Sequence, residues 1–312
     1  MTSGPSIAFK SALIIVNPKS GQGDSGVEQF AQHLRDAGVR VEMRETTADG
    51  TPEDYVHGLE DFDALVGAGG DGTVSSLAYA ARSLEKPYLP YPAGTANLIA
   101  QNLDLPKEPR ALADLFLSGQ TVTLDLAELE VNGEVHGFAM LAGLGLDAAM
   151  IRDSEHTKDR LGVAAYLASA LKQLRPQHAH FKLTLDGKEL EVEGMGVMVA
   201  NFGMANYRVP ITGDVSPADG KLTVIVLKGR SIVSLLPTLL GSLRAKLHLG
   251  NADLGDSLET FEATEVSVQA SQALPAQYDG ETLEGDVEVL KARVIPGAVR
   301  YITPAALKDL TT

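Results

Sequence analysis

A glycine-rich stretch at residues 69–73, GGDGT, follows an apolar run and precedes a helical pattern at residues 74–84. The order strand, glycine turn, helix places backbone N–H groups and the positive end of a helix dipole around one concavity, which suits a phosphate group. The glycines also leave room for a ligand to approach closely. Asp71 fits a phosphate site if it accepts a hydrogen bond from a ligand hydroxyl or acts through Mg²⁺. An ordinary turn near a helix N-cap is the simpler interpretation of this stretch taken alone.

A second stretch, DGE, sets Asp279 and Glu281 on either side of a glycine. A tight turn here would project both carboxylates, and one of them could accept the proton of an alcohol that attacks a phosphoryl group. A hairpin turn with a solvated Glu is the alternative, which the residue types alone favour. The sequence leaves open which of the two carboxylates would be the base.

The elements that position the first turn alternate between strand and helix. Strand patterns occupy residues 11–16, 39–44, 64–68 and 88–92, and helical patterns occupy 27–37, 74–84, 98–102 and 108–117 with another starting at Thr51. This alternation predicts a mainly parallel sheet with helices on both faces. Ligands of such sheets bind beyond the carboxyl ends of the strands. Glycine-bearing loops at residues 19–23, 69–73 and 93–97 all follow strand ends, so together they indicate a nucleotide site.

The pattern changes near Thr121. Strands are predicted at residues 122–131, 135–142, 181–185, 190–199, 222–227, 265–270 and 287–295, and helices at 162–174 and 232–247. Asn132-Gly133 and Asp186-Gly187 are favoured hairpin turns. A run of strands after a run of alternation predicts a second, antiparallel domain, either a sandwich or a flattened barrel.

Composition bounds the class of protein. The chain has 312 residues, enough for two domains, with 44% hydrophobic and 21% charged residues, as in a folded globular protein. It has no cysteine, which excludes disulfides and thiolate sites. A net charge of −15 argues against binding to nucleic acid and against broad adhesion to anionic membranes. We see no secretory signal and no apolar run of about 18 residues, so we expect a cytoplasmic protein without a transmembrane segment.

Six motifs occur in order along the chain: NPKSG at residues 17–21, GGDGT at 69–73, PAGTAN at 92–97, GLGLDA at 143–148, DGKL at 219–222 and DGE at 279–281. This ordered set resembles the diacylglycerol kinase catalytic family, in its bacterial soluble lipid-kinase branch. That branch is related to sphingosine and ceramide kinases and, more distantly, to NAD kinase. The resemblance covers residues 13 to 301, nearly the whole chain.

The resemblance implies two domains. An α/β ATP-binding domain, related to NAD kinase and 6-phosphofructokinase, would span residues 1–125 and be completed by 298–312. An all-β sandwich at residues 126–297 would carry the carboxylate turn and the lipid-acceptor side, with the chemistry in the cleft between the domains. By resemblance, the catalytic residues would be Asp279, Glu281 and Asp71. The nucleotide would be bound by Asn17, Thr46, Gly69, Gly70, Asp71, Gly72, Thr73, Gly94, Thr95 and Asn97.

A structural Mg²⁺ loop is implied at residues 216–221. Asp219 would supply a carboxylate, and Ser216 and Lys221 would supply backbone carbonyls, which are the hard oxygen ligands that Mg²⁺ prefers. A plain turn before the strand at 222–227 is the alternative interpretation. Two differences from the family pattern lie near the phosphates: Ser75-Ser76 replaces the usual Asn-Glu, and Leu98 replaces the usual Asp.

These features predict an ATP- and Mg²⁺-dependent lipid kinase that transfers the γ-phosphoryl group to the hydroxyl of diacylglycerol, phosphatidylglycerol or a sphingoid base. The lipid would be presented at a membrane surface, with transient association of a cytoplasmic enzyme of phospholipid metabolism. One alternative is a NAD kinase-like enzyme, which shares the GGDGT turn. Another is a catalytically silent regulator that binds nucleotide or lipid, which Ser75, Ser76 and Leu98 motivate. A homodimer stays open, since an exposed sheet edge could pair with a second subunit.

Overall fold

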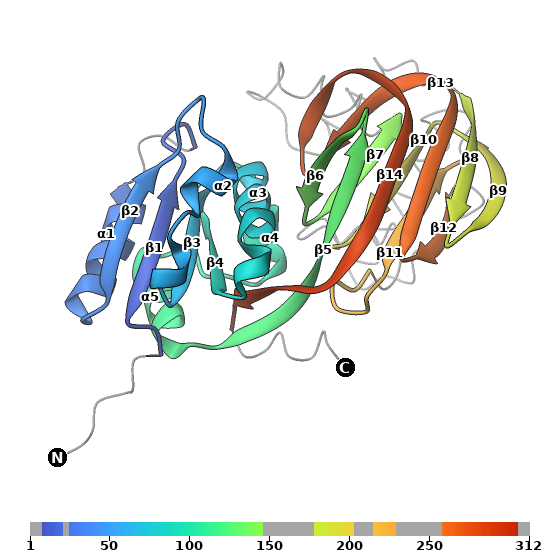
Figure 1. Cartoon of the computed structure of the whole chain (residues 1–312). Helices are drawn as coiled ribbons and strands as arrows, with labels where there is room; N and C mark the ends of the chain where they lie inside the picture. The colour runs from blue at the N-terminus through green and yellow to red at the C-terminus, as the bar shows by residue number, and fades with distance from the viewer. Residues whose placement is uncertain (1–7, 21–24, 146–177, 203–214, 229–257, 305–312) are drawn as a thin grey trace, which may run out of the picture. The chain divides into compact units, whose positions relative to one another are not determined.

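The computed structural model describes residues 8–20, 25–145, 178–202, 215–228 and 258–304. The chain divides into two compact units, drawn in Figure 1. Unit 1 comprises residues 1–126 and 295–312, and unit 2 comprises residues 127–294. The helices predicted at 162–174 and 232–247, and residues 146–148 of the GLGLDA motif, lie outside the described residues.

Unit 1 is built on a parallel sheet. Its strands are β1 (Ser11–Val16), β2 (Arg40–Glu45), β3 (Ala64–Gly69), β4 (Pro87–Pro92) and the end of β14 (Glu281–Ile302). They lie in the order β2-β1-β3-β4-β14, with every neighbouring pair parallel. β3 is buried along its whole length, as expected of a strand covered on both faces. Arg300 and Tyr301 pair with Pro87 and Tyr88, so the end of the chain's last strand completes this sheet.

Helices cover both faces of this sheet, as Figure 1 shows. They are α1 (Ser25–Asp36), α2 (Pro52–Tyr55), α3 (Asp71–Ala81), α4 (Leu98–Asn102) and α5 (Pro109–Ser118), with 3₁₀ turns at Leu59–Asp61 and Arg82–Leu84. On one face, Phe30 of α1 packs against Phe116 of α5 and Tyr91 of β4, with ring centroids 6.3 and 5.4 Å apart. On the other face, the Tyr88 hydroxyl donates to the Val74 carbonyl of α3 at 2.8 Å. Tyr88 and Tyr91 are three residues apart on one strand and therefore point to opposite faces.

Unit 2 is an antiparallel β structure. Its strands are the end of β5 (Thr121–Val131), β6 (Glu134–Phe138), β7 (Leu141–Gly145), β8 (Ala179–Leu185), β9 (Lys188–Gly194), β10 (Gly196–Ala200), β11 (Leu222–Leu227), β12 (Leu258–Ala263), β13 (Glu265–Tyr278) and most of β14. The main path is β12-β11-β10-β7-β13-β14, and the hairpins β5–β6 and β8–β9 extend it along β14 and β13. The first part of β13 pairs with β8 and its last three residues pair with β7, so this strand passes from one layer of the sandwich to the other. Alternate residues of these strands form one apolar core.

Several predicted strand limits were wrong for identifiable reasons. The strand predicted at 135–142 is two strands. It breaks because the N–H groups of Ala139, Met140 and Leu141 donate to the Asp279 carboxylate and not to a neighbouring strand. The strand predicted at 190–199 breaks at Met195 into β9 and β10. β13 continues through Pro275 by means of register shifts, although a proline normally marks a strand end. β12 was not predicted, because its sequence LETFEA gives only a short apolar alternation.

Candidate functional site

The loop that follows β1 contacts the glycine turn that follows β3. The Asn17 side-chain amide donates to the Thr73 hydroxyl at 2.9 Å, and the Asn17 backbone N–H donates to the Ala68 carbonyl at 2.8 Å. The Gly70 N–H donates to the Ser20 hydroxyl at 3.2 Å. The adjacency of Asn17 and Thr73 agrees with the sequence prediction. Ser20, which lies within the NPKSG motif, was not among the predicted site residues.

The glycine turn leaves an open backbone surface at the start of α3. Gly70 is the N-cap residue, and no side chain caps the helix. A Cβ added to Gly70 would meet no atom within 4 Å, whereas one added to Gly69 would lie 2.6 Å from the Thr73 Cβ. Gly69 is thus required by packing, and Gly70 borders empty space. Uncapped N–H groups beside such a space can bind an anion.

A third loop, at residues 93–97, packs directly on this turn. A Cβ at Gly94 would lie 2.5 Å from the Gly70 Cα. The Asp71 carboxylate accepts a hydrogen bond from the Ile99 N–H of α4 at 2.9 Å. Asp71, which we expected to serve a ligand hydroxyl or Mg²⁺, therefore also uses one carboxylate oxygen to hold α4 in place. It is the only acidic residue within residues 69–76 and 93–98.

The remaining predicted nucleotide residues have distinct surroundings. The Asn97 amide closes the third loop by accepting from the Gly94 N–H and donating to the Gly94 carbonyl, both at 2.8 Å. Thr95 is exposed and borders a cavity of about 160 Å³ with Lys107. Thr46 follows β2, and its N–H donates to the Val16 carbonyl at 2.8 Å. Asn97 thus shapes the loop, while Thr95 presents its side chain to solvent.

Three residues mark the differences from the family pattern. Ser75 is buried, and its hydroxyl has no hydrogen-bond partner among the described residues. The Ser76 hydroxyl donates to the Thr73 carbonyl at 3.0 Å. Leu98 begins α4 and is half-buried. None of these three residues has a carboxylate, so Asp71 supplies the one carboxylate within the two turns.

In unit 2, Asp279 has a buried carboxylate that is surrounded by backbone N–H groups. One oxygen accepts from Ala139 at 2.7 Å, and the other accepts from Met140 at 2.8 Å and Leu141 at 3.0 Å. The Asp279 N–H donates to the Leu141 carbonyl at 2.8 Å. The residue is 7% exposed and adopts the left-handed backbone region, with φ of 44°. These bonds fix the turn against the start of β7.

Glu281, two residues later, has a different environment. Its side chain is exposed, and the described residues give its carboxylate no hydrogen bond. It pairs in register with Tyr278 across the turn. Burial raises the pKa of the Tyr278 phenol, and the charges of Glu281, Asp279 and Glu134 raise it further. The two carboxylates that the sequence could not distinguish are therefore distinguished by burial and by hydrogen bonding.

The predicted magnesium loop contains one exposed carboxylate. Asp219 accepts a hydrogen bond from the Lys221 N–H at 2.9 Å, and Gly220 takes a positive φ of 72°. The Lys221 ammonium pairs with Glu262 at 2.6 Å, and its pKa is raised mainly by this hydrogen bond. Across the described residues, no three His, Cys, Asp or Glu side chains cluster as a metal site would require. Asp219 is the one carboxylate of this loop, so a magnesium ion here would take its other ligands from backbone carbonyls and water.

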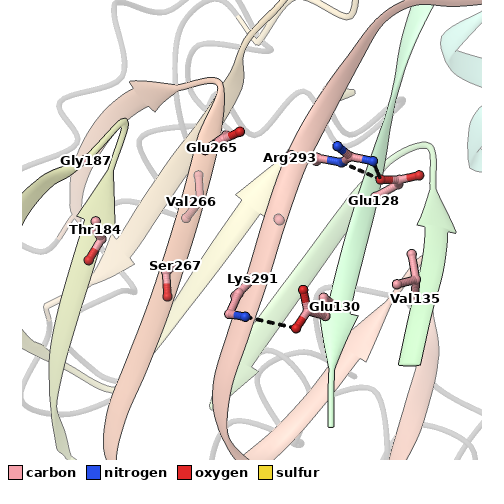
Figure 2. Close-up of a pocket in the computed structure, with 11 residues that line it drawn as sticks. Glu128, Glu130, Val135, Thr184, Gly187, Glu265, Val266, Ser267, Lys291 and Arg293 are labelled. Carbon is pink, nitrogen blue, oxygen red and sulfur yellow. Dashed lines mark hydrogen bonds and ion pairs between the residues drawn. The ribbon is translucent and has the colours of Figure 1, made fainter. Parts of the chain in front are cut away.

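A hollow of about 450 Å³ in unit 2, drawn in Figure 2, carries mixed charges. Lys291 of β14 bonds to Glu130 of β5 at 2.9 Å, and Arg293 pairs with Glu128 on the same two strands. Because each cation has a carboxylate partner, the hollow does not offer a free positive charge to a phosphate. We do not include it in the candidate site.

Comparison with known proteins gives two family models that together span most of the chain. Residues 11–129 match the diacylglycerol kinase catalytic domain, and residues 141–303 match the YegS C-terminal NAD kinase beta sandwich-like domain. The chain belongs to the family of proteins that combine a diacylglycerol kinase catalytic domain with a YegS C-terminal domain. The match identifies a kinase whose acceptor is an alcohol group.

Similar proteins of this family span nearly the same length. A protein of Yersinia enterocolitica named "Probable lipid kinase YegS-like" is 27% identical over 300 residues, which cover 94% of this chain and 96% of that one. The diacylglycerol kinase of Bacillus subtilis is 28% identical over 284 residues, covering 88% and 90% of the two chains. A crystal structure of a diacylglycerol kinase from Bacillus anthracis superposes with a TM-score of 0.70 at 21% identity, covering 96% and 98%. That superposition supports the fold of a parallel-sheet domain and a β-sandwich domain.

Proposed function

We propose that this kinase transfers the γ-phosphoryl group of ATP to the hydroxyl of a lipid, with Mg²⁺ as cofactor. The observation that carries the proposal is the contact between the Gly70 and Gly94 turns, closed on one side by the Asn17–Thr73 hydrogen bond. Three loops that follow three strand ends meet there around an uncapped helix N-terminus. Such a surface of N–H groups suits the phosphates of a nucleotide.

Unit 1 supplies the nucleotide side of the proposed reaction. Gly70, Gly72 and Thr73 would hold phosphates through the start of α3, while Thr46 and Thr95 border the ligand. One oxygen of Asp71 accepts the Ile99 N–H, and its other oxygen remains for Mg²⁺ or a ligand hydroxyl. Magnesium, when bound, would neutralise charge on the phosphates.

Unit 2 supplies the carboxylate turn. We propose that Glu281 accepts the proton of the lipid hydroxyl and that Asp279 holds the turn. A carboxylate that already accepts three backbone hydrogen bonds has little capacity left for a substrate proton. Glu281 is exposed and keeps that capacity. The Asp219 loop would serve as a structural Mg²⁺ site and would take no part in this proton transfer.

The acceptor is proposed to be a lipid because both curated relatives are named lipid or diacylglycerol kinases. Diacylglycerol, phosphatidylglycerol and a sphingoid base all carry a suitable hydroxyl. In the part of the chain that the structure describes, no helix is long and apolar enough to cross a membrane. We therefore propose that the enzyme meets its lipid at a membrane surface by transient association.

Two other functions are each favoured by one observation. The C-terminal half matches a domain described as NAD kinase beta sandwich-like, which favours a small-molecule acceptor. Ser75, Ser76 and Leu98 remove carboxylates from the nucleotide turns, which favours a silent nucleotide- or lipid-binding regulator. The assay described next distinguishes both of these functions from that of a lipid kinase.

The test is a set of single-acceptor assays with labelled ATP and Mg²⁺, using diacylglycerol, phosphatidylglycerol, sphingosine and NAD in detergent micelles. Phosphorylation of one lipid, lost when EDTA is added, is the expected result. Phosphorylation of NAD alone would move the function to the NAD kinase class. ATP binding measured by calorimetry without transfer to any acceptor would favour the silent regulator.

A further inference from the structure

An imidazole and a phenol lie stacked beside the carboxylate turn. The rings of His136 on β6 and Tyr278 on β13 have centroids 5.0 Å apart and an interplanar angle of 25°. The Tyr278 hydroxyl lies 3.4 Å from the His136 Nδ1. Tyr278 directly precedes Asp279, and β6 leads directly into the backbone that the Asp279 carboxylate binds. Both rings therefore belong to segments that shape the turn.

The Tyr278 phenol retains its proton, since burial and three nearby carboxylates raise its pKa. A protonated phenol is a hydrogen-bond donor, and the His136 Nδ1 lies within hydrogen-bond distance of it, at 3.4 Å. In a neutral imidazole that accepts at Nδ1, the proton is on Nε2. Nε2 is buried, has no hydrogen-bond partner among the described residues, and lies 3.7 Å from a Glu134 oxygen.

A charged imidazole reverses this arrangement. Both nitrogens of a histidinium are donors, so Nδ1–H would donate to the phenol oxygen. The phenol O–H would then have to turn to another acceptor. Glu281 pairs in register with Tyr278 across the turn, and the side chains of such a cross-strand pair lie next to each other. Because the Asp279 oxygens already accept three N–H groups, Glu281 is the acceptor that this change would engage.

We propose that His136 is a positioning residue that acts through Tyr278: as neutral imidazole it draws the phenol O–H away from Glu281, and as imidazolium it releases that O–H to Glu281. A carboxylate that accepts a phenol hydrogen bond is a weaker base. The neutral state therefore leaves Glu281 ready to accept the proton of the substrate alcohol. This inference rests on the proposed role of Glu281 as the base.

The charged and titratable groups that face the pair come from four places. They are Glu134 on β6, Tyr278 on β13, Asp279 in the turn and Glu281 at the start of β14. Under this proposal, transfer is faster with a neutral His136 than with a charged one.

The first test is histidine nitrogen NMR of the labelled full chain, with the His136 signals assigned through His136→Gln. Above about pH 8, we expect the Nε2–H tautomer with an accepting Nδ1, and a change of the Nδ1 shift in Tyr278→Phe. An Nδ1–H tautomer, or an Nδ1 shift that Tyr278→Phe does not change, would overturn the proposal. This readout needs no catalysis, so it remains decisive even if no acceptor is phosphorylated.

The second test is the pH profile of kcat for phosphoryl transfer. His136→Phe keeps an aromatic ring but removes the acceptor, so kcat should fall about tenfold at alkaline pH with KM for ATP unchanged. His136→Gln offers an accepting oxygen that cannot be protonated, and it should restore most of kcat. His180→Gln is the matched control, since His180 is exposed and pairs with Glu193 at 3.3 Å. Transfer that occurs with an unchanged profile in His136→Phe would refute this inference alone, whereas wild-type protein without transfer would refute the proposed function.

Discussion

The Asp71 carboxylate accepts a hydrogen bond from the Ile99 N–H at 2.9 Å, so the acid of the glycine turn also fixes the second residue of α4. This bond joins the turn after β3 to the loop after β4. A substitution at Asp71 can therefore change both the chemistry and the local packing. Variants that separate the two effects are needed.

Asp71→Asn should separate charge from packing. The amide oxygen can still accept the Ile99 N–H, so stability should stay near wild type, while loss of the charge should lower phosphoryl transfer at least about 100-fold. Asp71→Ala should lose transfer and, in addition, about 1 kcal/mol of unfolding free energy. Urea denaturation and labelled-phosphate assays measure the two effects. Near-normal transfer in Asp71→Asn would remove its charge from the mechanism.

Gly70 and Gly94 provide a pair in which the same methyl group has different effects. Gly70→Ala places its Cβ in open space at a φ of −78°, so the fold should be unchanged and ATP affinity should fall about tenfold. Gly94→Ala places its Cβ 2.5 Å from the Gly70 Cα, so unfolding free energy should fall by about 1–3 kcal/mol. Calorimetric titration with ATP and urea denaturation test both. Unchanged ATP affinity in Gly70→Ala would exclude the open side of this turn as the phosphate site.

Asp279 and Glu281 should differ in what they support. Asp279→Ala leaves three backbone N–H groups without their acceptor, so unfolding free energy should fall by about 3 kcal/mol or more. Glu281→Gln should leave stability unchanged and lower kcat about 10²- to 10⁴-fold. Denaturation curves and initial rates on one acceptor compare them. Full activity in Glu281→Gln would contradict its assignment as the base.

Tyr88 should make stability depend on alkaline pH. Burial, followed by the neighbouring Tyr301, raises the pKa of the Tyr88 phenol well above its usual value. A raised folded-state pKa means that the stabilisation is complete below the unfolded pKa of about 10 and is lost as the pH rises through the folded value. Tyr88→Phe removes the hydrogen bond to Val74 and should therefore lower the unfolding free energy by about 1 kcal/mol at neutral pH. Above about pH 10, the unfolding free energy of this variant should fall less steeply than that of wild type. A difference from wild type that stays constant with pH would contradict this.

The sequence was sufficient to predict the two fold classes and the positions of the glycine-bearing loops, because both depend on local patterns. β1 and β11 have the predicted limits, since buried apolar runs flanked by polar residues define them. The meeting of Gly70 with Gly94 follows from parallel strand ends sharing one edge. The family comparison supports the resemblance and the two fold classes.

Other features required the three-dimensional structure because they join residues far apart in the chain. Asp279 binds a backbone 138 to 140 positions away, so no local pattern distinguishes it from Glu281. The same bonds end β6, which the apolar alternation alone continued to residue 142. The stacking of His136 on Tyr278 likewise spans 142 positions. The hydrogen bond from Ile99 to Asp71 could not be predicted either, because the turn motif is equally consistent with an Asp71 that binds a ligand.

The most direct test of the central claim is transfer of labelled γ-phosphate from ATP, with Mg²⁺, into a total lipid extract resolved by chromatography. Wild-type protein, Gly70→Ala and Glu281→Gln would be compared at equal concentrations of folded protein. We predict one labelled lipid with the wild type, reduced with Gly70→Ala and nearly absent with Glu281→Gln. No labelled lipid from wild-type protein that binds ATP, or equal labelling by all three proteins, would contradict the account.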